Sequence, residues 1–249
     1  MKNTTKIQDP KIHAYLAQCG LGSRRQIEKW ILEKRVLVNG KLCVIGQRVS
    51  SKDKILVDGK KVAALKERDE TPVVIAYHKQ VGEICTRAQS ELPTVFERLP
   101  EVNGRWISVG RLDVNTSGLL LFTNNGTLAN RLMHPKYEVE RKYHVRVHGK
   151  LNQAILNQFL TGIMLDGDFL KFDSIQPLKS LITEVANQWF IVTLRQGKYR
   201  EIRRLFESQD CQVSRLMRVQ YGNISLPRSL RQGQYQYLSQ TQIEGLVGT

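Results

Sequence analysis

The sequence of 249 residues is 41% apolar and 24% charged, which excludes a disordered tail or a disulfide-stapled miniprotein and allows one large or two unequal domains. Apolar runs such as Leu119–Phe122 fall far short of the roughly 20 residues of a membrane span, and residues 1–10 have no signal-peptide core. The net charge is +15, with 16 basic and 8 acidic side chains in the first 70 residues against 22 and 15 in the remaining 179. This excess indicates a polyanionic partner such as nucleic acid.

The first 65 residues predict two helices followed by short strands. Apolar residues recur at the spacing of one helix face over residues 12–19. Ser23 is a suitable N-cap for a second helix over residues 24–34, which begins with two arginines. Two β-type runs follow, over residues 36–41 and 55–60, and they contain an Asn-Gly and an Asp-Gly turn.

The stretch GSRRQIEKWILEKRVLVNGK, at residues 22–41, resembles the S4 domain, a small RNA-binding module. The resemblance covers residues 10–65 and implies that RNA phosphates contact four basic side chains: Arg24, Arg25, Lys29 and Lys34. From the residues alone, a solvated basic helix face is the alternative. Residues 64–72 are highly charged, lack an apolar rhythm and end at Pro72, so we expect a linker there.

The second part of the chain, residues 73–249, mixes strand and helix patterns. Strand-like runs are expected at 72–77, 106–109, 119–123, 143–147 and 189–194, and helical patterns at 128–133, 152–160 and 199–208. Regular β-α-β alternation and a Gly-rich phosphate loop are both absent from the sequence. We therefore predict an α+β domain with a largely antiparallel mixed sheet and flanking helices.

The densest cluster of polar and turn-forming residues is GRLDVNTSGLLLFTNNG, at residues 110–126, where a loop holding Arg111 and Asp113 leads into an apolar strand. From the residues alone, an aspartate such as Asp113 is more often a turn cap than a catalyst. The motif resembles the signature loop of the RsuA/RluB-type pseudouridine synthases, which combine an S4 domain with a catalytic domain. This resemblance implies that Asp113 is the essential catalytic aspartate and that Arg111 takes the place of the flipped base.

Two further stretches resemble motifs of the same family. In RKYHVRV, residues 141–147, the resemblance implies that Tyr143 stacks on the uracil. In QGKYREIRRLF, residues 196–206, the resemblance implies that Arg203 pairs with Asp113. Ile202 and Leu205 lie at helical spacing toward the core, and we group them with the base-binding residues. Without the resemblance, Tyr143 is equally a core-edge tyrosine and the arginine-rich segment an ordinary surface helix.

The resemblance implies isomerisation of a specific uridine in a stem-loop of large-subunit ribosomal RNA, the partner molecule. We expect a cytoplasmic monomer without membrane contact. Uracil leaves the ribose at N1 and rejoins through C5, so no cofactor is expected, and the sequence has no dinucleotide fingerprint or metal-ligand cluster. Four widely spaced cysteines are expected to be reduced thiols. The alternatives are a uridine of small-subunit RNA, another large-subunit uridine, and a non-catalytic ribosome-assembly factor.

Overall fold

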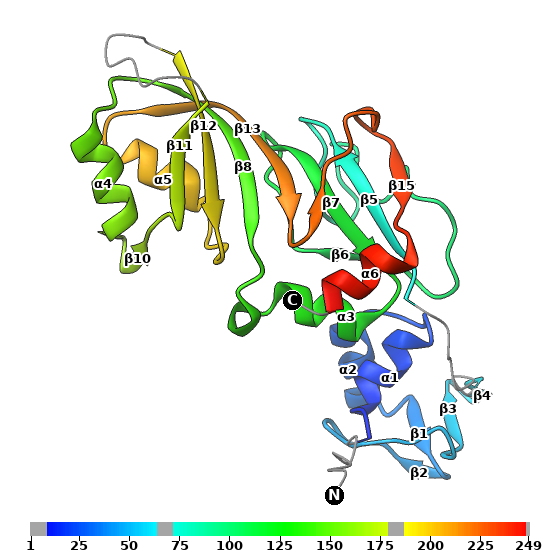
Figure 1. Cartoon of the computed structure of the whole chain (residues 1–249). Coiled ribbons are helices and arrows are strands. Elements are labelled where there is room, and N and C mark those ends of the chain that lie inside the picture. Colours follow the sequence, from blue (N-terminus) through cyan, green and yellow to red (C-terminus); the bar gives the residue numbers. More distant parts are fainter. Residues whose placement is uncertain (1–8, 64–71, 179–186, 248–249) are drawn as a thin grey trace, which may run out of the picture. The chain divides into compact units, whose positions relative to one another are not determined.

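The structure, a computed structural model, describes residues 9–63, 72–178 and 187–247. It forms two compact units (Figure 1), the first comprising Met1–Thr71 with Val102–Arg105 and the second comprising Pro72–Glu101 with Trp106–Thr249. Apart from Pro72, the predicted linker at 64–72 lies outside the described residues.

The first unit contains the two helices and the short strands predicted for it. These elements are α1 (Ile12–Gln18), α2 (Arg24–Leu32), β1 (Val36–Val38), β2 (Lys41–Leu42), β3 (Ile55–Val57) and β4 (Lys60–Lys61). The Ser23 hydroxyl accepts a hydrogen bond from the Gln26 amide at 3.1 Å, which confirms the predicted N-cap. The strands form an antiparallel sheet in the order β2-β1-β3-β4.

The second unit is α+β, as predicted, and is built on a nine-stranded sheet. Its sheet strands are β5 (Val74–Lys79), β6 (Ile107–Val109), β7 (Ser117–Thr123), β8 (Arg141–His148), β11 (Ser174–Pro177), β12 (Asn187–Leu194), β13 (Gln212–Tyr221), β14 (Ile224–Ser225) and β15 (Tyr235–Tyr237). The main path is β11-β12-β8-β13-β7-β5-β15, with β14 on β13 and β6 on β7. Strands β9 (Ile163–Leu165) and β10 (Asp168–Leu170) form a separate hairpin.

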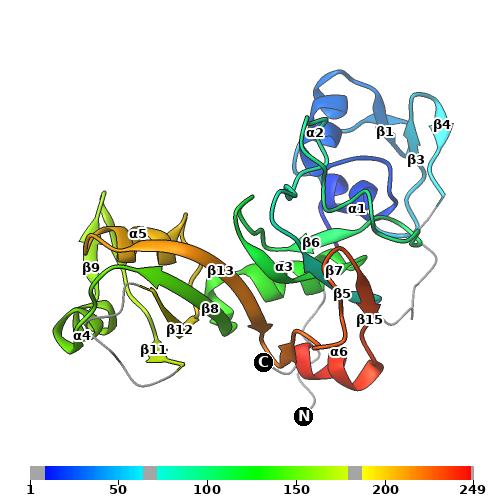
Figure 2. The same ribbon diagram turned by 90° about the horizontal axis from the view of Figure 1, so that it is seen from above.

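The helices cover the two ends of this sheet. They are α3 (Gly126–Met133), the 3-10 helix η1 (Pro135–Tyr137), α4 (Gln153–Thr161), α5 (Glu201–Glu207) and α6 (Gln240–Val247). Helices α3 and α6 lie at the β5–β7 end, whereas α4 and α5 lie at the β11–β12 end (Figures 1 and 2). Among the described residues, every helix is too short or too polar to cross a membrane.

A separate core lies at each end of the sheet. At one end, α3 and α6 bury Leu132 and Leu246 against Leu119 and Leu121 of β7. At the other end, four phenylalanines form a ring cluster with centroids 5.0–6.3 Å apart: Phe159, Phe172, Phe190 and Phe206. The middle of the sheet is therefore held between two independently packed halves.

Strands β7 and β13 join these two halves through the one parallel pairing of the described sheet. Their contact is short, with Met217 opposite Ser117 and Arg218 opposite Gly118. Gly118 has φ +107°, and a Cβ atom there would lie 2.2 Å from the Arg218 carbonyl oxygen. Only glycine fits this position, because any side chain would force the two strands apart.

Replacement of Gly118 by alanine is expected to destabilise the second unit by at least about 2 kcal/mol, because it adds a strained φ and a backbone overlap. Thermal denaturation followed by circular dichroism measures this loss. Gly126→Ala is the matched control, since its Cβ would meet only a side-chain atom at 3.6 Å. Equal melting temperatures for the two variants would contradict the close approach of β7 and β13.

Candidate active site

A hollow of about 600 Å³ opens where the loop before β7 meets β8 and the segment that leads into α5. It is lined by residues from all three motifs singled out in the sequence, namely Arg111, Asp113, Tyr143, Ile202 and Arg203. These residues are up to 92 positions apart in the chain. Their convergence on one hollow makes it the candidate active site.

The loop that carries Asp113 is fixed through its backbone. Each carbonyl oxygen from residue 113 to residue 116 accepts at least one hydrogen bond. The Asp113 oxygen accepts from Lys79 Nζ and from the Thr116 amide, both at 3.0 Å, and the Thr116 oxygen accepts from Lys79 Nζ at 2.8 Å. Between them, the Val114 oxygen accepts from the Gly82 amide at 3.0 Å and the Asn115 oxygen accepts from Arg203 Nη2 at 2.9 Å. The loop is thus preorganised without use of the Asp113 carboxylate.

Lys79 supports the candidate site, and the sequence analysis did not identify it. It ends β5, is fully buried and donates to the Asp113 and Thr116 carbonyl oxygens, at either end of the loop that carries Asp113. Burial lowers the pKa of its ammonium group, whereas the negative charges of Glu83 and Asp113 act in the opposite direction. A lysine at the end of a strand that begins with an apolar run was the available signal.

The Asp113 carboxylate is exposed and makes no hydrogen bond or ion pair with any residue that the structure describes. The alternative of a turn-capping aspartate therefore has no support, since the turn is closed by the Asp113 carbonyl oxygen and the Thr116 amide at 3.0 Å. An unpaired carboxylate on a rigid loop, at the wall of a hollow, is available to a substrate.

The predicted pairing of Arg203 with Asp113 is wrong as a direct contact. Arg203 is 8% exposed, and its Nη1 and Nη2 donate to the carbonyl oxygens of Val213 and Asn115, both at 2.9 Å. These bonds link β13 to the loop that carries Asp113 at the point where β13 and β7 separate, so the guanidinium is occupied by backbone oxygens. Burial lowers the pKa of Arg203, as does the positive charge of Arg200, whereas the charge of Asp113 raises it.

Tyr143 lies on β8 and is 8% exposed, with its side chain at the hollow. Ile202 is also buried and lines the hollow, and its contact with a bound base stays a prediction. Leu205 is fully buried and lines none of the hollows described. The structure does not support its grouping with the base-binding residues, because its side chain packs in the core beneath α5.

The basic residues of the first unit are exposed, as their proposed contact with RNA requires: Arg24, Arg25, Lys29 and Lys34. Lys29 lies 3.7 Å from Glu33, a weak exposed pair. Arg35, by contrast, bonds to Asp58 at 2.6 and 2.7 Å and ties the segment between α2 and β1 to the β3–β4 turn. The contact of these four exposed side chains with RNA stays a prediction.

Comparison with known proteins gives consistent matches for both units. Residues 73–208 match the family model described as RNA pseudouridylate synthase, and residues 11–55 match that of the S4 domain. A solved structure titled "Crystal structure of pseudouridylate synthase" aligns with a TM-score of 0.66 and 25% identity over 95% of this chain and 99% of the other.

Relatives named "Ribosomal large subunit pseudouridine synthase B" match nearly the whole chain. That of Pasteurella multocida is 48% identical over 96% of this chain and 70% of its own length. That of Pseudomonas aeruginosa is 46% identical over 94% of this chain, which spans 61% of the relative. That of Buchnera aphidicola subsp. Schizaphis graminum is 46% identical over 92% of this chain and 90% of its own length.

Proposed function

The chain belongs to the RNA pseudouridylate synthase family, and we propose that it converts one uridine in a stem-loop of large-subunit ribosomal RNA to pseudouridine. The single observation that carries this proposal is the convergence of Asp113, Tyr143 and Arg203 on one hollow. The target is inferred from relatives named as large-subunit enzymes at 46–48% identity.

The reaction breaks the bond between N1 of uracil and C1′ of ribose and forms a bond between C5 and C1′. C5 loses its proton to solvent and N1 ends protonated, so that atoms and electrons balance without an added reactant. The uridine must first leave the RNA stack, which costs a few kcal/mol. The site has to repay this cost and then hold the detached base while it turns.

The residues of the hollow suit these tasks. Tyr143 offers the flat face of a ring on which uracil can stack and turn, an interaction of about 1–3 kcal/mol per base. Arg111 is exposed at the rim, where it can take the place that the base vacates. Asp113 supplies the carboxylate that acts on the ribose or the base. Arg203 acts through the loop, since it holds the Asn115 carbonyl oxygen at 2.9 Å.

Mapping of pseudouridines in total ribosomal RNA from a strain that lacks the gene tests the proposal. We expect carbodiimide-arrested primer extension to lose one large-subunit stop, which returns with the wild-type gene. A lost stop in small-subunit RNA would keep the chemistry and correct the target. If every stop persists while the pure protein still binds RNA, the non-catalytic assembly factor becomes the better description.

The first unit is proposed to bind RNA phosphates through the start of α2. A double variant with Arg24→Gln and Arg25→Gln should flatten the slope of log affinity against log salt concentration by about 0.7–0.9 for each lost phosphate contact. Fluorescence anisotropy over a salt series measures this slope. Lys60→Gln with Lys61→Gln is the matched control, with the same charge change on the exposed strand β4. Equal slope changes for the two pairs would contradict a specific contact at α2.

We also propose that the protein acts as a cytoplasmic monomer. The structure contains no disulfide among its four cysteines, which suits a reducing compartment. Sedimentation of the purified protein at the mass of one chain would support the monomer, and the mass of two chains would contradict it.

A further inference from the structure

Tyr199 is an exposed aromatic ring at the edge of the active site to which the mechanism gives no task. It is 74% exposed, the largest exposed fraction among the large hydrophobic side chains of the described residues. It lines the catalytic hollow together with Asp113 and Tyr143. An aromatic ring left in water beside an RNA-modifying site is a suitable surface for a second base.

Tyr199 also lines a second hollow, of about 440 Å³, that adjoins the first. The two share five lining residues, Arg111, Leu112, Asp113, Tyr199 and Arg200. The second hollow extends over residues 84–86 and 111–115. Tyr199 therefore stands at the boundary between a hollow suited to the target uridine and another space next to it. Two successive nucleotides of one RNA strand would fit this arrangement, with one nucleotide in each hollow.

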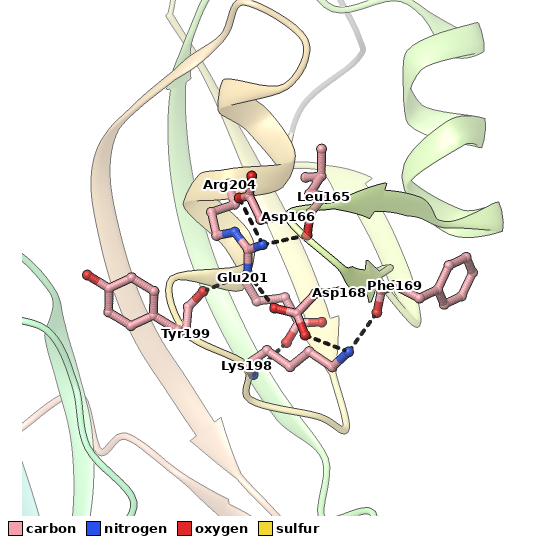
Figure 3. A network of polar contacts seen from close by, with 8 residues as sticks. All are labelled: Leu165, Asp166, Asp168, Phe169, Lys198, Tyr199, Glu201 and Arg204. Carbon is pink, nitrogen blue, oxygen red and sulfur yellow. Dashed lines mark hydrogen bonds and ion pairs between the residues drawn. The ribbon is translucent and has the colours of Figure 1, made fainter.

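The backbone on either side of Tyr199 is held by a network of polar contacts, shown in Figure 3. Lys198 Nζ donates to the Phe169 carbonyl oxygen at 3.0 Å and lies 3.4 Å from Asp168 Oδ1. The Lys198 amide donates to the buried Glu201 carboxylate at 3.0 Å. The β9–β10 hairpin thus anchors the residue directly before Tyr199.

Arg204 completes the network from α5. Its guanidinium donates to Asp168 Oδ2 at 2.9 Å, to the Leu165 carbonyl oxygen at 2.7 Å and to Asp166 Oδ2 at 3.2 Å. Arg204, and after it Lys198, lowers the pKa of Asp168, so this carboxylate is charged at neutral pH. In Figure 3 the Tyr199 ring points away from the network. The ring is therefore exposed on a fixed backbone, which reduces the entropy lost when a base binds.

The charges near the ring suit a nucleotide. Lys198 is occupied by Asp168, and Arg200 Nη2 pairs with Glu207 at 3.0 Å. Arg111 is exposed and forms no ion pair with any described residue, and it lies on the wall shared by the two hollows. A phosphate between two nucleotides, one in each hollow, would find this free cation beside it.

We propose that Tyr199 stacks on the base of the nucleotide next to the target uridine, and that the second hollow receives this nucleotide. The inference rests on the proposed function and deepens it, because it makes Tyr199 a determinant of which uridine is selected. A neighbouring base that stacks well would hold its uridine at the catalytic hollow, whereas a missing base would not.

The test uses purified protein and a synthetic ribosomal stem-loop that carries the mapped uridine, together with two versions that have an abasic nucleotide just before or just after it. Tyr199→Ala should weaken binding of the parent RNA about 5- to 150-fold, the loss that about 1–3 kcal/mol corresponds to. Tyr199→Phe keeps the ring and should stay within about threefold. With the abasic nucleotide at the partner position, Tyr199→Ala should cause no further loss.

Tyr237→Ala is the matched control, since Tyr237 is 51% exposed on the edge strand β15 and lines none of the hollows described. Three results would overturn the inference. Tyr199→Ala could bind the parent RNA within twofold of the wild type, or Tyr199→Phe could bind it as weakly as Tyr199→Ala. The third is that the loss of affinity caused by Tyr199→Ala multiplies with the loss caused by the abasic nucleotide at both positions. Wild-type protein that forms no pseudouridine in any of the RNAs would instead overturn the proposed function, and this inference with it.

Discussion

Asp113→Asn is expected to lower pseudouridine formation at least about 100-fold and to leave RNA affinity within about twofold. Asparagine has nearly the same shape but carries no charge and no basic oxygen. The Asp113 side chain makes no hydrogen bond or ion pair with any described residue, and the loop is held through backbone oxygens, so the substitution removes the carboxylate without breaking a polar contact of the fold. Release of tritium from RNA labelled at C5 of uracil measures turnover, because C5 gives up its hydrogen when the new bond forms.

Asp210→Asn is a suitable control for this substitution. Asp210 is also exposed, and it has φ +54°, which asparagine adopts readily. Its turnover should equal that of the wild type. Residual activity of Asp113→Asn above a few per cent would remove Asp113 from the catalytic role. Loss of RNA affinity equal to the loss of turnover would indicate a binding role instead.

Elements held by local chemistry could be predicted from the sequence. Helix α2 begins at the predicted cap, and it ends at Leu32 rather than at residue 34 because Lys34 turns to φ +58°. The Asn39-Gly40 turn between β1 and β2 has positive φ at both residues, as this dipeptide favours. In each case the determinant lies within a few residues of its effect.

Strand β13 could not be predicted in this way, although it joins the two halves of the sheet. Its sequence includes Arg215 and Arg218, which disguise the alternation of a strand. Arg218 is 2% exposed and donates from Nε to the Leu119 carbonyl oxygen at 2.7 Å. The hydrogen-bond partner of this buried charged side chain is therefore 99 positions away in the sequence. Side-chain periodicity contains no information about such a distant partner.

The same limit explains the error at Arg203. The charge of an arginine suggests a carboxylate partner. Where β13 separates from β7, however, backbone carbonyl oxygens need hydrogen-bond donors, and Arg203 donates to two such oxygens. Residue identity and the family resemblance located the site. The division of work within it, with Asp113 free for substrate and Arg203 and Lys79 committed to the loop, depends on the tertiary structure.

Lys79→Met is expected to destabilise the second unit by about 2–5 kcal/mol, because it leaves buried carbonyl oxygens without their donor. The Thr116 oxygen loses its 2.8 Å bond, and the Asp113 oxygen keeps only the Thr116 amide. The loop should then shift, and a displacement of about 1 Å at a catalytic group can cost about 100-fold in rate. We therefore expect kcat to fall at least tenfold at a temperature where the variant is still folded, with the KM for RNA changed far less.

Lys171→Met is the matched control, since Lys171 is exposed and its replacement removes the same charge from the surface. Its melting temperature and kcat should match those of the wild type. Lys79→Met with normal kcat but a lower melting temperature would make Lys79 a residue of the fold alone. A normal melting temperature with normal kcat would contradict the contacts themselves. A fall in kcat beyond the fraction unfolded is the result that ties this buried ammonium group to the position of the Asp113 carboxylate, because no other residue of the protein is substituted.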